Sequence, residues 1–294
     1  MEAIETSGGA VHWLDTGGPR LRAASWPGGA KTALLLHGRT ECIEKYFEPV
    51  AALRARGYAV WTMDWRGQGR SARLLRNAGA NHVASFDHHV ADLGRLLTAM
   101  PAPDVVLAQS MGAHVALRTL AARPGLAGRA VLLAPMIDVP RPMPLWAARL
   151  LSALVCAVPG MAGRFGPGTA RVPDRRRPFD RNPLTGCARR FADDLALLDQ
   201  PGLLVGGATW GWLRAAFQSI AVLRRPGFAR TVKLPVLIVL AGTDRVVDNA
   251  AARRLAARLP DARLIEIAGA RHELLRGEDA VQAQLWAAFD AFVA

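Results

Sequence analysis

Cysteine is scarce in this chain of 294 residues, which contains only three. Cys42, Cys156 and Cys187 form no C-x-x-C pair and follow no regular spacing. Disulfide frameworks and structural zinc sites depend on closely spaced cysteines, so the sequence argues against both and is typical of a reducing compartment. The spacing of metal ligands is absent elsewhere too, and we expect neither a metal ion nor a cofactor.

A long hydrophobic run is missing as well. The most apolar stretch, 145–162, contains Arg149, Pro159 and Gly160. It is too short and too broken for a membrane span, and we interpret it as a buried or lid helix. The first ten residues hold two glutamates and no basic region followed by an apolar run, so no signal peptide is expected. These absences favour a cytoplasmic protein, with a peripheral position at the inner face of a membrane left open.

Positive charge is unevenly distributed, and arginine supplies nearly all of it. The formal net charge is +13. Residues 136–230 contain fourteen arginines against six aspartates, with no lysine or glutamate, and so carry +8 of it. Such a surface attracts anionic lipid headgroups or acidic substrates, although a merely solvated face is the other interpretation. No DNA- or RNA-binding signature accompanies the charge, so nucleic acid is not an expected partner.

Apolar runs alternate with helix-like segments over most of the chain. Continuous apolar strands separated by helices predict an α/β fold with a mostly parallel central sheet and helices on both faces. The expected strands are 32–36, 59–63, 105–109, 130–134, 236–241 and 263–267, with weaker strands at 11–14 and 21–26 as an antiparallel edge. The expected helices between them are 43–55, 86–99, 111–122, 249–259 and 279–293.

The alternation stops after residue 134 and resumes at 234. The interval is rich in Pro, Gly, Arg and Trp, with helical patterns near 145–155, 189–198 and 209–223. An insertion that leaves a sheet and returns to it predicts a helical cap over the carboxyl ends of the strands, where open α/β sheets bind ligands. We therefore divide the chain into a core, residues 1–135 and 231–294, and an inserted cap, residues 136–230.

Ser110 stands where an apolar strand ends abruptly and a helix begins. Such a strand–turn–helix context is that of a nucleophile elbow, whose tight turn requires small residues two positions before and after the serine. These are Ala108 and Gly112. The usual first small residue is glycine, and we interpret the alanine as tolerated because it adds one methyl group.

A serine hydroxyl needs a base within hydrogen-bond reach and a third group that orients the base. In this fold the acid and then the base follow the serine along the chain. Asp244 follows the strand at 236–241, and His272 follows the last strand. Asp138, which also follows a strand, is an alternative acid, and the alternative bases are His12, His82, His88, His89 and His114.

Stabilising the oxyanion requires two further N–H donors. The backbone N–H of Met111, at the start of the helix after Ser110, is one natural donor. His37-Gly38 follows a strand and exposes the next amide, so the N–H of Arg39 is the second candidate. We expect His37 to pack in this loop, and we interpret the segment 64–71 as a structural loop.

These motifs, taken in order, resemble the α/β-hydrolase superfamily, and within it the lysophospholipase and monoacylglycerol lipase group with its serine aminopeptidase-like domain. The matching segments are 36–41, 44–46, 64–69, 86–93, 109–112, 242–247 and 271–275. The resemblance implies an α/β-hydrolase fold with an inserted helical cap, the triad Ser110, Asp244 and His272, and the donors Met111 and Arg39. Ala108 and Gln109 depart from the residues usual in the family.

The resemblance also implies a serine ester hydrolase acting on a lipid with one acyl chain, a lysophospholipid or a monoacylglycerol. General carboxylesterase, peptidase, acyltransferase and non-catalytic members of the same fold are the alternatives. The arginines around Arg171–Arg181, among them Arg175, Arg176 and Arg177, are candidates for contact with a phosphate headgroup. The cap offers apolar side chains for the acyl chain, chiefly Trp146, Trp210, Trp212 and Phe217, with Leu150 and Leu151.

Overall fold

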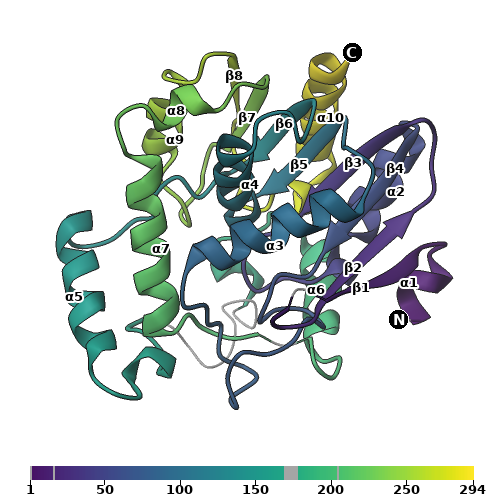
Figure 1. Cartoon of the computed structure of the whole chain (residues 1–294). Helices are drawn as coiled ribbons and strands as arrows, with labels where there is room; N and C mark the ends of the chain where they lie inside the picture. Colours follow the sequence, from purple (N-terminus) through teal and green to yellow (C-terminus); the bar gives the residue numbers. More distant parts are fainter. Residues whose placement is uncertain (1, 16, 169–177, 204) are drawn as a thin grey trace.

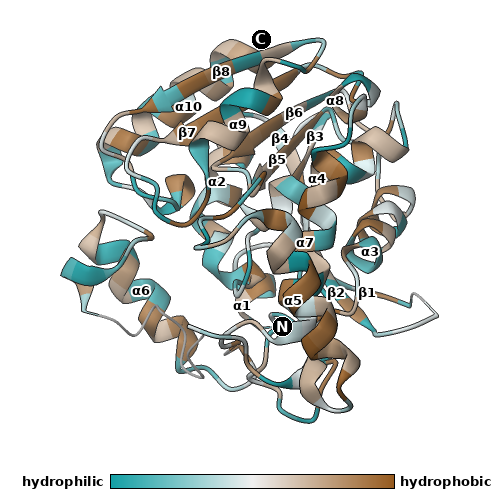
Figure 2. Cartoon of the chain, turned by 90° about the vertical axis from the view of Figure 1, so that its left-hand side faces the viewer, coloured by the Kyte–Doolittle hydropathy of each residue, from teal (hydrophilic) through white to brown (hydrophobic). Residues whose placement is uncertain are grey.

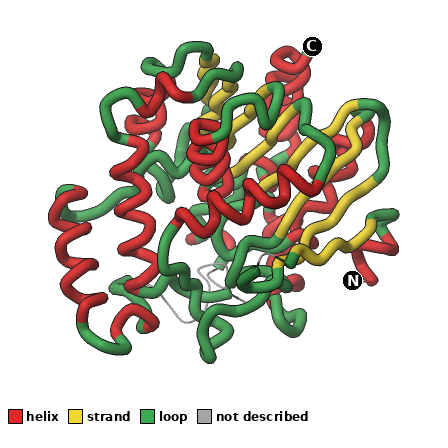
Figure 3. The backbone as a smooth tube through the Cα atoms, in the orientation of Figure 1, coloured by secondary structure: helices red, strands yellow, loops and turns green. Residues whose placement is uncertain are grey.

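The computed structural model of the chain describes residues 2–15, 17–168, 178–203 and 205–294. A twisted sheet of eight strands crosses the middle of the molecule, with helices in front of it and behind it (Figures 1 and 3). The strands are β1 (Ala10–Leu14), β2 (Leu21–Trp26), β3 (Lys31–Leu36), β4 (Tyr58–Met63), β5 (Val105–Gln109), β6 (Arg129–Leu133), β7 (Val236–Ala241) and β8 (Ala262–Ile267).

The strand order across the sheet is β1-β2-β4-β3-β5-β6-β7-β8. Strand β2 pairs antiparallel with β1 and β4, and every other pair is parallel. The inner strands β5 and β7 are buried along their whole length, whereas the edge strand β8 is mostly accessible. Burial on both faces explains why the inner strands are continuous apolar runs. The predicted α/β sheet with an antiparallel edge is confirmed, and each strand begins and ends within one residue of its expected position.

Two layers of helices cover the sheet. Helices α3 and α4 lie side by side in front of it, and α2 and α10 lie behind it (Figure 1). Arg56, just after α2, pairs with Asp290 of α10 at 2.7 Å and so joins the two rear helices. The helices outside residues 136–230 are α1 (Glu2–Thr6), α2 (Phe47–Ala55), α3 (Phe86–Ala99), α4 (Met111–Ala122), α9 (Asn249–Ala256) and α10 (Asp279–Val293), with the 3-10 turns η1 (Ile43–Tyr46) and η5 (Leu274–Arg276).

The described part of residues 136–230 adds no strand to the sheet. It forms the three expected helices, α5 (Leu145–Ala157), α6 (Ala188–Leu198) and α7 (Trp210–Leu223), and the short α8 (Phe228–Thr231). Helices α5 and α7 pack against each other on one side of the molecule, and α6 lies on the other side (Figures 1 and 2). The two packed helices run antiparallel, because Phe165, beyond the end of α5, bridges to Thr209 at the start of α7. The division into a core and a cap remains a prediction.

A short strap ties the segment 206–209 to the loop between β4 and α3. The backbone N–H of Gly206 donates to the carbonyl of Gly79 at 2.6 Å, and the N–H of Thr209 donates to the carbonyl of Asn81 at 2.9 Å. Asn81 returns a bond from its own N–H to the carbonyl of Gly207 at 3.1 Å. The start of α7 is therefore fixed to the core by backbone hydrogen bonds.

Candidate active site

Ser110 forms the sharp turn between β5 and α4. Its φ of 54° and ψ of −116° are rare for a residue with a side chain, and such strain costs about 1–3 kcal/mol. The Ser110 N–H donates to the carbonyl of Leu133 at 2.9 Å, and the Ser110 carbonyl accepts from the N–H of Met136 at 3.1 Å. The end of β6 and the loop after it therefore hold the strained residue in place.

Close packing explains the small residues on either side of Ser110. A Cβ on Gly112 would stand 2.5 Å from the carbonyl oxygen of His37, a distance that no side chain tolerates. Ala108 is fully buried between its ladder partners Leu36 of β3 and Leu132 of β6. Its methyl group is accommodated in the core, and the sharp turn at Ser110 forms with alanine at this position.

His272 joins Ser110 and Asp244 through two hydrogen bonds. Its Nε2 lies 2.9 Å from Ser110 Oγ, and its Nδ1 lies 2.7 Å from Asp244 Oδ2. With a carboxylate beside Nδ1, that nitrogen carries the proton and Nε2 accepts the hydrogen bond of the Ser110 hydroxyl. Three loops after β5, β7 and β8 thus bring together residues that are 162 and 28 positions apart along the chain.

The loop after β7 holds the Asp244 carboxylate in place. Its Oδ1 accepts from the backbone N–H groups of Val246 at 2.7 Å and Val247 at 3.1 Å, which leaves Oδ2 for His272. The Asp244 side chain is fully buried, and His272 and Ser110 are only 4% and 8% exposed. Shielding from water strengthens the interactions within such a chain of hydrogen bonds.

The alternative acid and base have other partners. Asp138 is buried and forms ion pairs with Arg141 and Arg224. His114 is fully buried, with Nδ1 2.8 Å from the carbonyl of Met136 and Nε2 2.5 Å from the hydroxyl of Ser219. Burial lowers the pKa of His114 to about 3, so its imidazole is neutral at pH 7. These contacts connect α4 with α7 and leave both residues out of the chain that ends at Ser110.

The loop after β3 presses its backbone against Ser110. A Cβ on Gly38 would stand 3.2 Å from Ser110 Cβ and 2.8 Å from a Glu41 carboxylate oxygen. The Gly38 N–H donates to that carboxylate at 2.5 Å, and the Thr40 N–H donates to the side-chain oxygen of Gln68 at 2.5 Å. The two amides that flank Arg39 are therefore both held by side-chain acceptors next to Ser110.

The amide of Met111 has a different origin. Met111 is the first residue of α4, and the N–H groups of the first helical turn have no partner within the helix. They point along the helix axis toward the positive end of the helix dipole, which favours negative charge. The structure thus places the two expected donors, Met111 and Arg39, in the two backbone segments that lie against Ser110.

Behind these loops lies a buried charge cluster that sequence reasoning missed. Lys45 Nζ is 2.6 Å from Glu41 Oε1, 2.6 Å from Glu273 Oε2 and 3.2 Å from Asp194 Oδ2. Glu41 and Lys45 stand four residues apart and Glu273 directly follows His272. That spacing was a usable signal for one ion pair, whereas Asp194 comes from the segment 136–230 and no local pattern links it to the others.

The loop 64–71 is held by a second buried cluster. The Asp64 carboxylate accepts from Arg22 Nε at 2.7 Å and from the N–H groups of Ile43 at 3.0 Å and Arg70 at 2.8 Å. Burial raises the pKa of Asp64, but the nearby His37 imidazole and the Arg22 guanidinium outweigh it and hold that pKa below its usual range. These contacts fit the expected structural role of this loop.

The four side chains expected to contact an acyl chain do not gather in one place. Trp212 is buried beside Phe86, with ring centroids 5.6 Å apart, and the Arg39 guanidinium lies 5.2 Å above its ring. Trp210 and Phe217 are partly buried on the same helix. Trp146 is 68% exposed and lies in the first turn of α5, about 16 Å from the end that approaches Trp210, because the helices are antiparallel. Contact of these side chains with an acyl chain therefore stays a prediction, and Trp146 lies apart from the three on α7.

Other expected features lie outside these contacts. Of the arginines expected near a headgroup, Arg171 and Arg175–Arg177 fall outside the described residues, and the Arg181 side chain is exposed. Within the ranges that the structure describes, no group of His, Cys, Asp and Glu is arranged to hold a metal ion. No helix in the same ranges combines the length and the apolar character that a bilayer span requires.

The sequence of this chain is similar to that of a known protein family and of curated bacterial proteins. The family described as serine aminopeptidase, S33 (Hydrolase_4) matches residues 30–279. Lysophospholipase L2 of Escherichia coli (strain K12) is 34% identical over 266 residues, which span 86% of this chain and 77% of that protein. The probable lysophospholipase L2 of Haemophilus influenzae is 28% identical over 258 residues, 86% of this chain and 80% of that protein.

Solved structures share the fold. A soluble variant of monoglyceride lipase from Saccharomyces cerevisiae, in complex with a substrate analog, aligns with a TM-score of 0.76 and 17% identity over 99% of this chain and 96% of that chain. The monoacylglycerol lipase of Paleococcus ferrophilus aligns with a TM-score of 0.70 and 19% identity, covering 93% and 98%. The resemblance predicted from the motifs is thus confirmed, and the chain belongs to the serine aminopeptidase, S33 family, in the lysophospholipase and monoacylglycerol lipase-like group of the α/β-hydrolases.

Proposed function

We propose that this protein hydrolyses the carboxylic ester of a lipid with one acyl chain, through an acyl-enzyme on Ser110. The hydrogen-bonded chain from Ser110 through His272 to Asp244, at a strained turn, is the observation that carries the proposal. The two relatives named lysophospholipase L2 favour a lysophospholipid over a monoacylglycerol as the substrate.

Two half-reactions make up the proposed cycle. Ser110 Oγ attacks the ester carbonyl carbon while His272 Nε2 accepts the hydroxyl proton. The ester C–O bond then breaks, and the proton passes from His272 to the leaving alcohol. Asp244 orients the imidazole and stabilises its charged form, and the N–H groups of Met111 and Arg39 stabilise the oxyanion.

Water completes the cycle. It attacks the acyl-enzyme carbonyl and gives a proton to His272, which returns it to Ser110 as the fatty acid leaves. The fatty acid and the alcohol together account for the ester and one water molecule. Loss of one oxyanion donor typically lowers the rate by about a hundred- to a thousandfold.

The direct test is fatty-acid release from two lipids that share the same acyl chain, lysophosphatidylethanolamine and monoacylglycerol, with Ser110→Ala as the blank. We expect release by the wild type, none by the variant, and faster release from the lysophospholipid. A faster monoacylglycerol reaction would reassign the headgroup. No release from either lipid, with folded protein shown by circular dichroism, would reject the lipid substrate and leave small esters or peptides to be tried.

We further propose that the protein contacts the anionic inner face of a membrane through α5. Trp146, Leu150 and Leu154 follow one another every four residues along α5, and each is more than half exposed. This spacing places them on one side of a helix, and Figure 2 shows the brown, hydrophobic turns of α5 on the surface. A tryptophan beside aliphatic side chains is typical of a helix that lies in a membrane interface.

Charge around α5 supports an anionic surface as the occupant. Residues 139–168 contain Arg141, Arg149 and Arg164 and no acidic residue. Arg149 and Arg164 are exposed. Each arginine near an anionic leaflet contributes about 1 kcal/mol of attraction, which salt weakens.

Vesicle flotation tests this contact. The wild type should float with vesicles that contain phosphatidylglycerol and much less with pure phosphatidylcholine vesicles. Leu150→Ser combined with Leu154→Ser should abolish flotation. Leu264→Ser, at an exposed leucine on β8, is the matched control and should float like the wild type. Flotation of the α5 double variant equal to that of the control would reject the proposal.

A further inference from the structure

Lys45 is the centre of a buried cluster that joins three separate parts of the chain. Its ammonium group contacts the carboxylates of Glu41, Glu273 and Asp194, at 2.6, 2.6 and 3.2 Å. All four residues are at most 4% exposed. Ionised groups removed from water require close partners, so this geometry is stabilised by the simultaneous presence of all of them.

Each carboxylate belongs to a segment with a different task. Glu41 lies in the loop after β3, where its second oxygen accepts from the Gly38 N–H at 2.5 Å and from the Tyr46 hydroxyl at 2.7 Å. Glu273 directly follows His272, and its backbone N–H donates to the carbonyl of Leu184 at 2.7 Å. The cluster therefore touches the loop of the expected oxyanion donor and the loop of the expected base.

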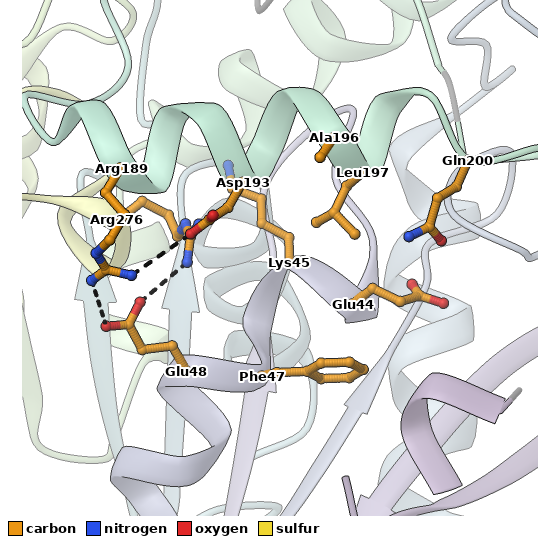
Figure 4. A pocket seen from close by; sticks show the side chains of 10 residues that line it. All are labelled: Glu44, Lys45, Phe47, Glu48, Arg189, Asp193, Ala196, Leu197, Gln200 and Arg276. Carbon is orange, nitrogen blue, oxygen red and sulfur yellow. Dashed lines mark hydrogen bonds and ion pairs between the residues drawn. The ribbon is translucent and has the colours of Figure 1, made fainter. Parts of the chain in front are cut away.

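Asp194 brings in the third segment, helix α6. It lies on the face of α6 that is turned inward, and its carboxylate is also 3.2 Å from the guanidinium of Arg276 in η5. The preceding residue, Asp193, faces a surface groove of about 580 Å³ between α6 and η1, and its side chain is 55% exposed. Figure 4 shows this groove with Asp193 near Arg276 and Lys45 beneath the helix.

We propose that Lys45 is a positioning residue through which the docking of α6 sets the geometry of the two loops that meet at Ser110. The argument rests on short, rigid connections. One hydrogen bond joins Glu41 to the backbone N–H of Gly38. Gly38 lies so close to Ser110 that a Cβ added to the glycine would stand 3.2 Å from Ser110 Cβ. On the other side, one peptide bond joins Glu273 to His272.

A shift of α6 would therefore move both loops. When Asp194 withdraws, the ammonium keeps only Glu41 and Glu273 of these three carboxylates, and both must adjust to it. A displacement of about 1 Å at a reacting group costs up to a hundredfold in rate. The segment 136–230 would thus affect the reaction in two ways: through the positions of the loops that carry Gly38 and His272, and through any contact with substrate.

The test compares Asp194→Asn with Asp193→Asn, the same change at the adjacent residue of the same helix. The substrate is p-nitrophenyl acetate, whose acyl group is too short to need the cap. The concentration of active sites is titrated by the burst of a phosphonate ester that labels Ser110. A role in folding alone would lower the number of titrated sites and leave the kcat per site unchanged.

We expect Asp194→Asn to lower kcat per titrated site about tenfold or more with KM within about twofold, and Asp193→Asn to match the wild type. Lys45→Arg, which keeps the charge but changes its shape, should lower kcat per site and retain the fold. Equal kcat per site for Asp194→Asn and Asp193→Asn would overturn the proposal. If Asp194→Asn does not fold, a Lys45→Arg enzyme with wild-type kcat per site would overturn it instead.

This inference rests on the proposed hydrolysis at Ser110, and the same experiment separates the two failures. If the wild type shows no phosphonate burst and no turnover above Ser110→Ala, the proposed function is at fault. If the wild type shows both and the α6 variants are equal, only the role of Lys45 is rejected.

Discussion

The two sides of the segment 136–230 are built in opposite ways. On the α6 side, buried charges hold the helix to the core: Arg190 and Asp194 are each only 4% exposed and both form ion pairs with core residues. On the α5 side, one row of apolar side chains faces outward, with Trp146 at 68% and Leu154 at 60% exposure. Helix α7 lies between them and is tied to α4 through His114 and Ser219.

This difference separates two tasks within the segment 136–230. Paired buried charges are poor stabilisers compared with apolar packing, but they define one geometry, which suits the side that adjoins the catalytic loops. An apolar row that is more than half exposed contributes little to folding and suits contact with lipid. We therefore expect substitutions on the α6 side to change stability and turnover, and those on α5 to change surface binding.

The largest effect on ester hydrolysis is expected from substitution of Ser110, the proposed nucleophile. Ser110→Ala should lower ester hydrolysis by at least about 10⁴-fold, because the acyl-enzyme cannot form. The measurement is the rate of fatty-acid release at saturating lysophospholipid, with the fold checked by circular dichroism. Residual activity near that of the wild type would show that Ser110 is not the nucleophile. The α6 side would then no longer be expected to affect turnover through the loops around Ser110.

Acid should lower the free energy of unfolding through two buried histidines, His89 and His114. His114 is the one whose contact with Ser219 connects α4 with α7. Burial lowers the pKa of His89 and His114 to about 3, against about 6.5 in an unfolded chain. Above pH 6.5 neither state is protonated, and below it only the unfolded state binds the proton. The free energy of unfolding should therefore fall by about 2 kcal/mol per histidine between pH 7 and pH 5, about 4 kcal/mol for both.

Urea unfolding at the two pH values measures this loss, and a variant separates the two shares. His89 packs between Trp65 and Phe86. His89→Phe should therefore fit the site and remove about half of the pH dependence. His88→Phe, at the exposed neighbouring residue, is the control and should leave the dependence unchanged. An unchanged slope in His89→Phe would contradict the assignment.

Arg190 provides the sharpest test of the α6 side alone. It donates to Glu48 at 2.5 and 2.8 Å and to the carbonyl of Gly277 at 2.6 Å. Arg190→Met leaves that carbonyl without this donor, so we expect the free energy of unfolding to fall by about 2–3 kcal/mol. Arg189→Met is the matched control: that side chain is 62% exposed, and its loss should cost less than about 0.5 kcal/mol. If denaturant titration shows the same loss of unfolding free energy for both variants, the buried ion pairs of Arg190 do not hold α6 more firmly than exposed ones.

The sequence predicted the features that follow from local patterns and missed those that depend on tertiary packing. The strands and the elbow at Ser110 are local patterns: a buried strand is a continuous apolar run, and a sharp turn needs Gly112 next to a backbone carbonyl. Chain order then singled out Asp244 and His272, because loops at the carboxyl ends of parallel strands meet at one edge of the sheet.

The Lys45 cluster could not be found in this way. Glu41 and Asp194 are more than 150 positions apart, and only the packed fold brings them to one ammonium group. The relative positions of the aromatic side chains in the segment 136–230 were out of reach for a related reason. Composition showed four large side chains in the segment, but the antiparallel packing of α5 and α7 decides which of them are near each other, and it places Trp146 at the far end.

The smallest effect is expected on α5, and its size makes it informative. Leu150 is 54% exposed, so Leu150→Ser removes few contacts within the protein and should change the free energy of unfolding by less than about 0.5 kcal/mol. Leu223→Ser on α7, at a leucine only 1% exposed, should cost several times more, because it buries a hydroxyl where a methyl-rich side chain was packed. If denaturant titration shows that Leu150→Ser is as costly as Leu223→Ser, the outer face of α5 packs against protein in solution. A second copy of the chain would then be the first occupant to examine in place of a lipid surface, by light scattering across a range of protein concentrations.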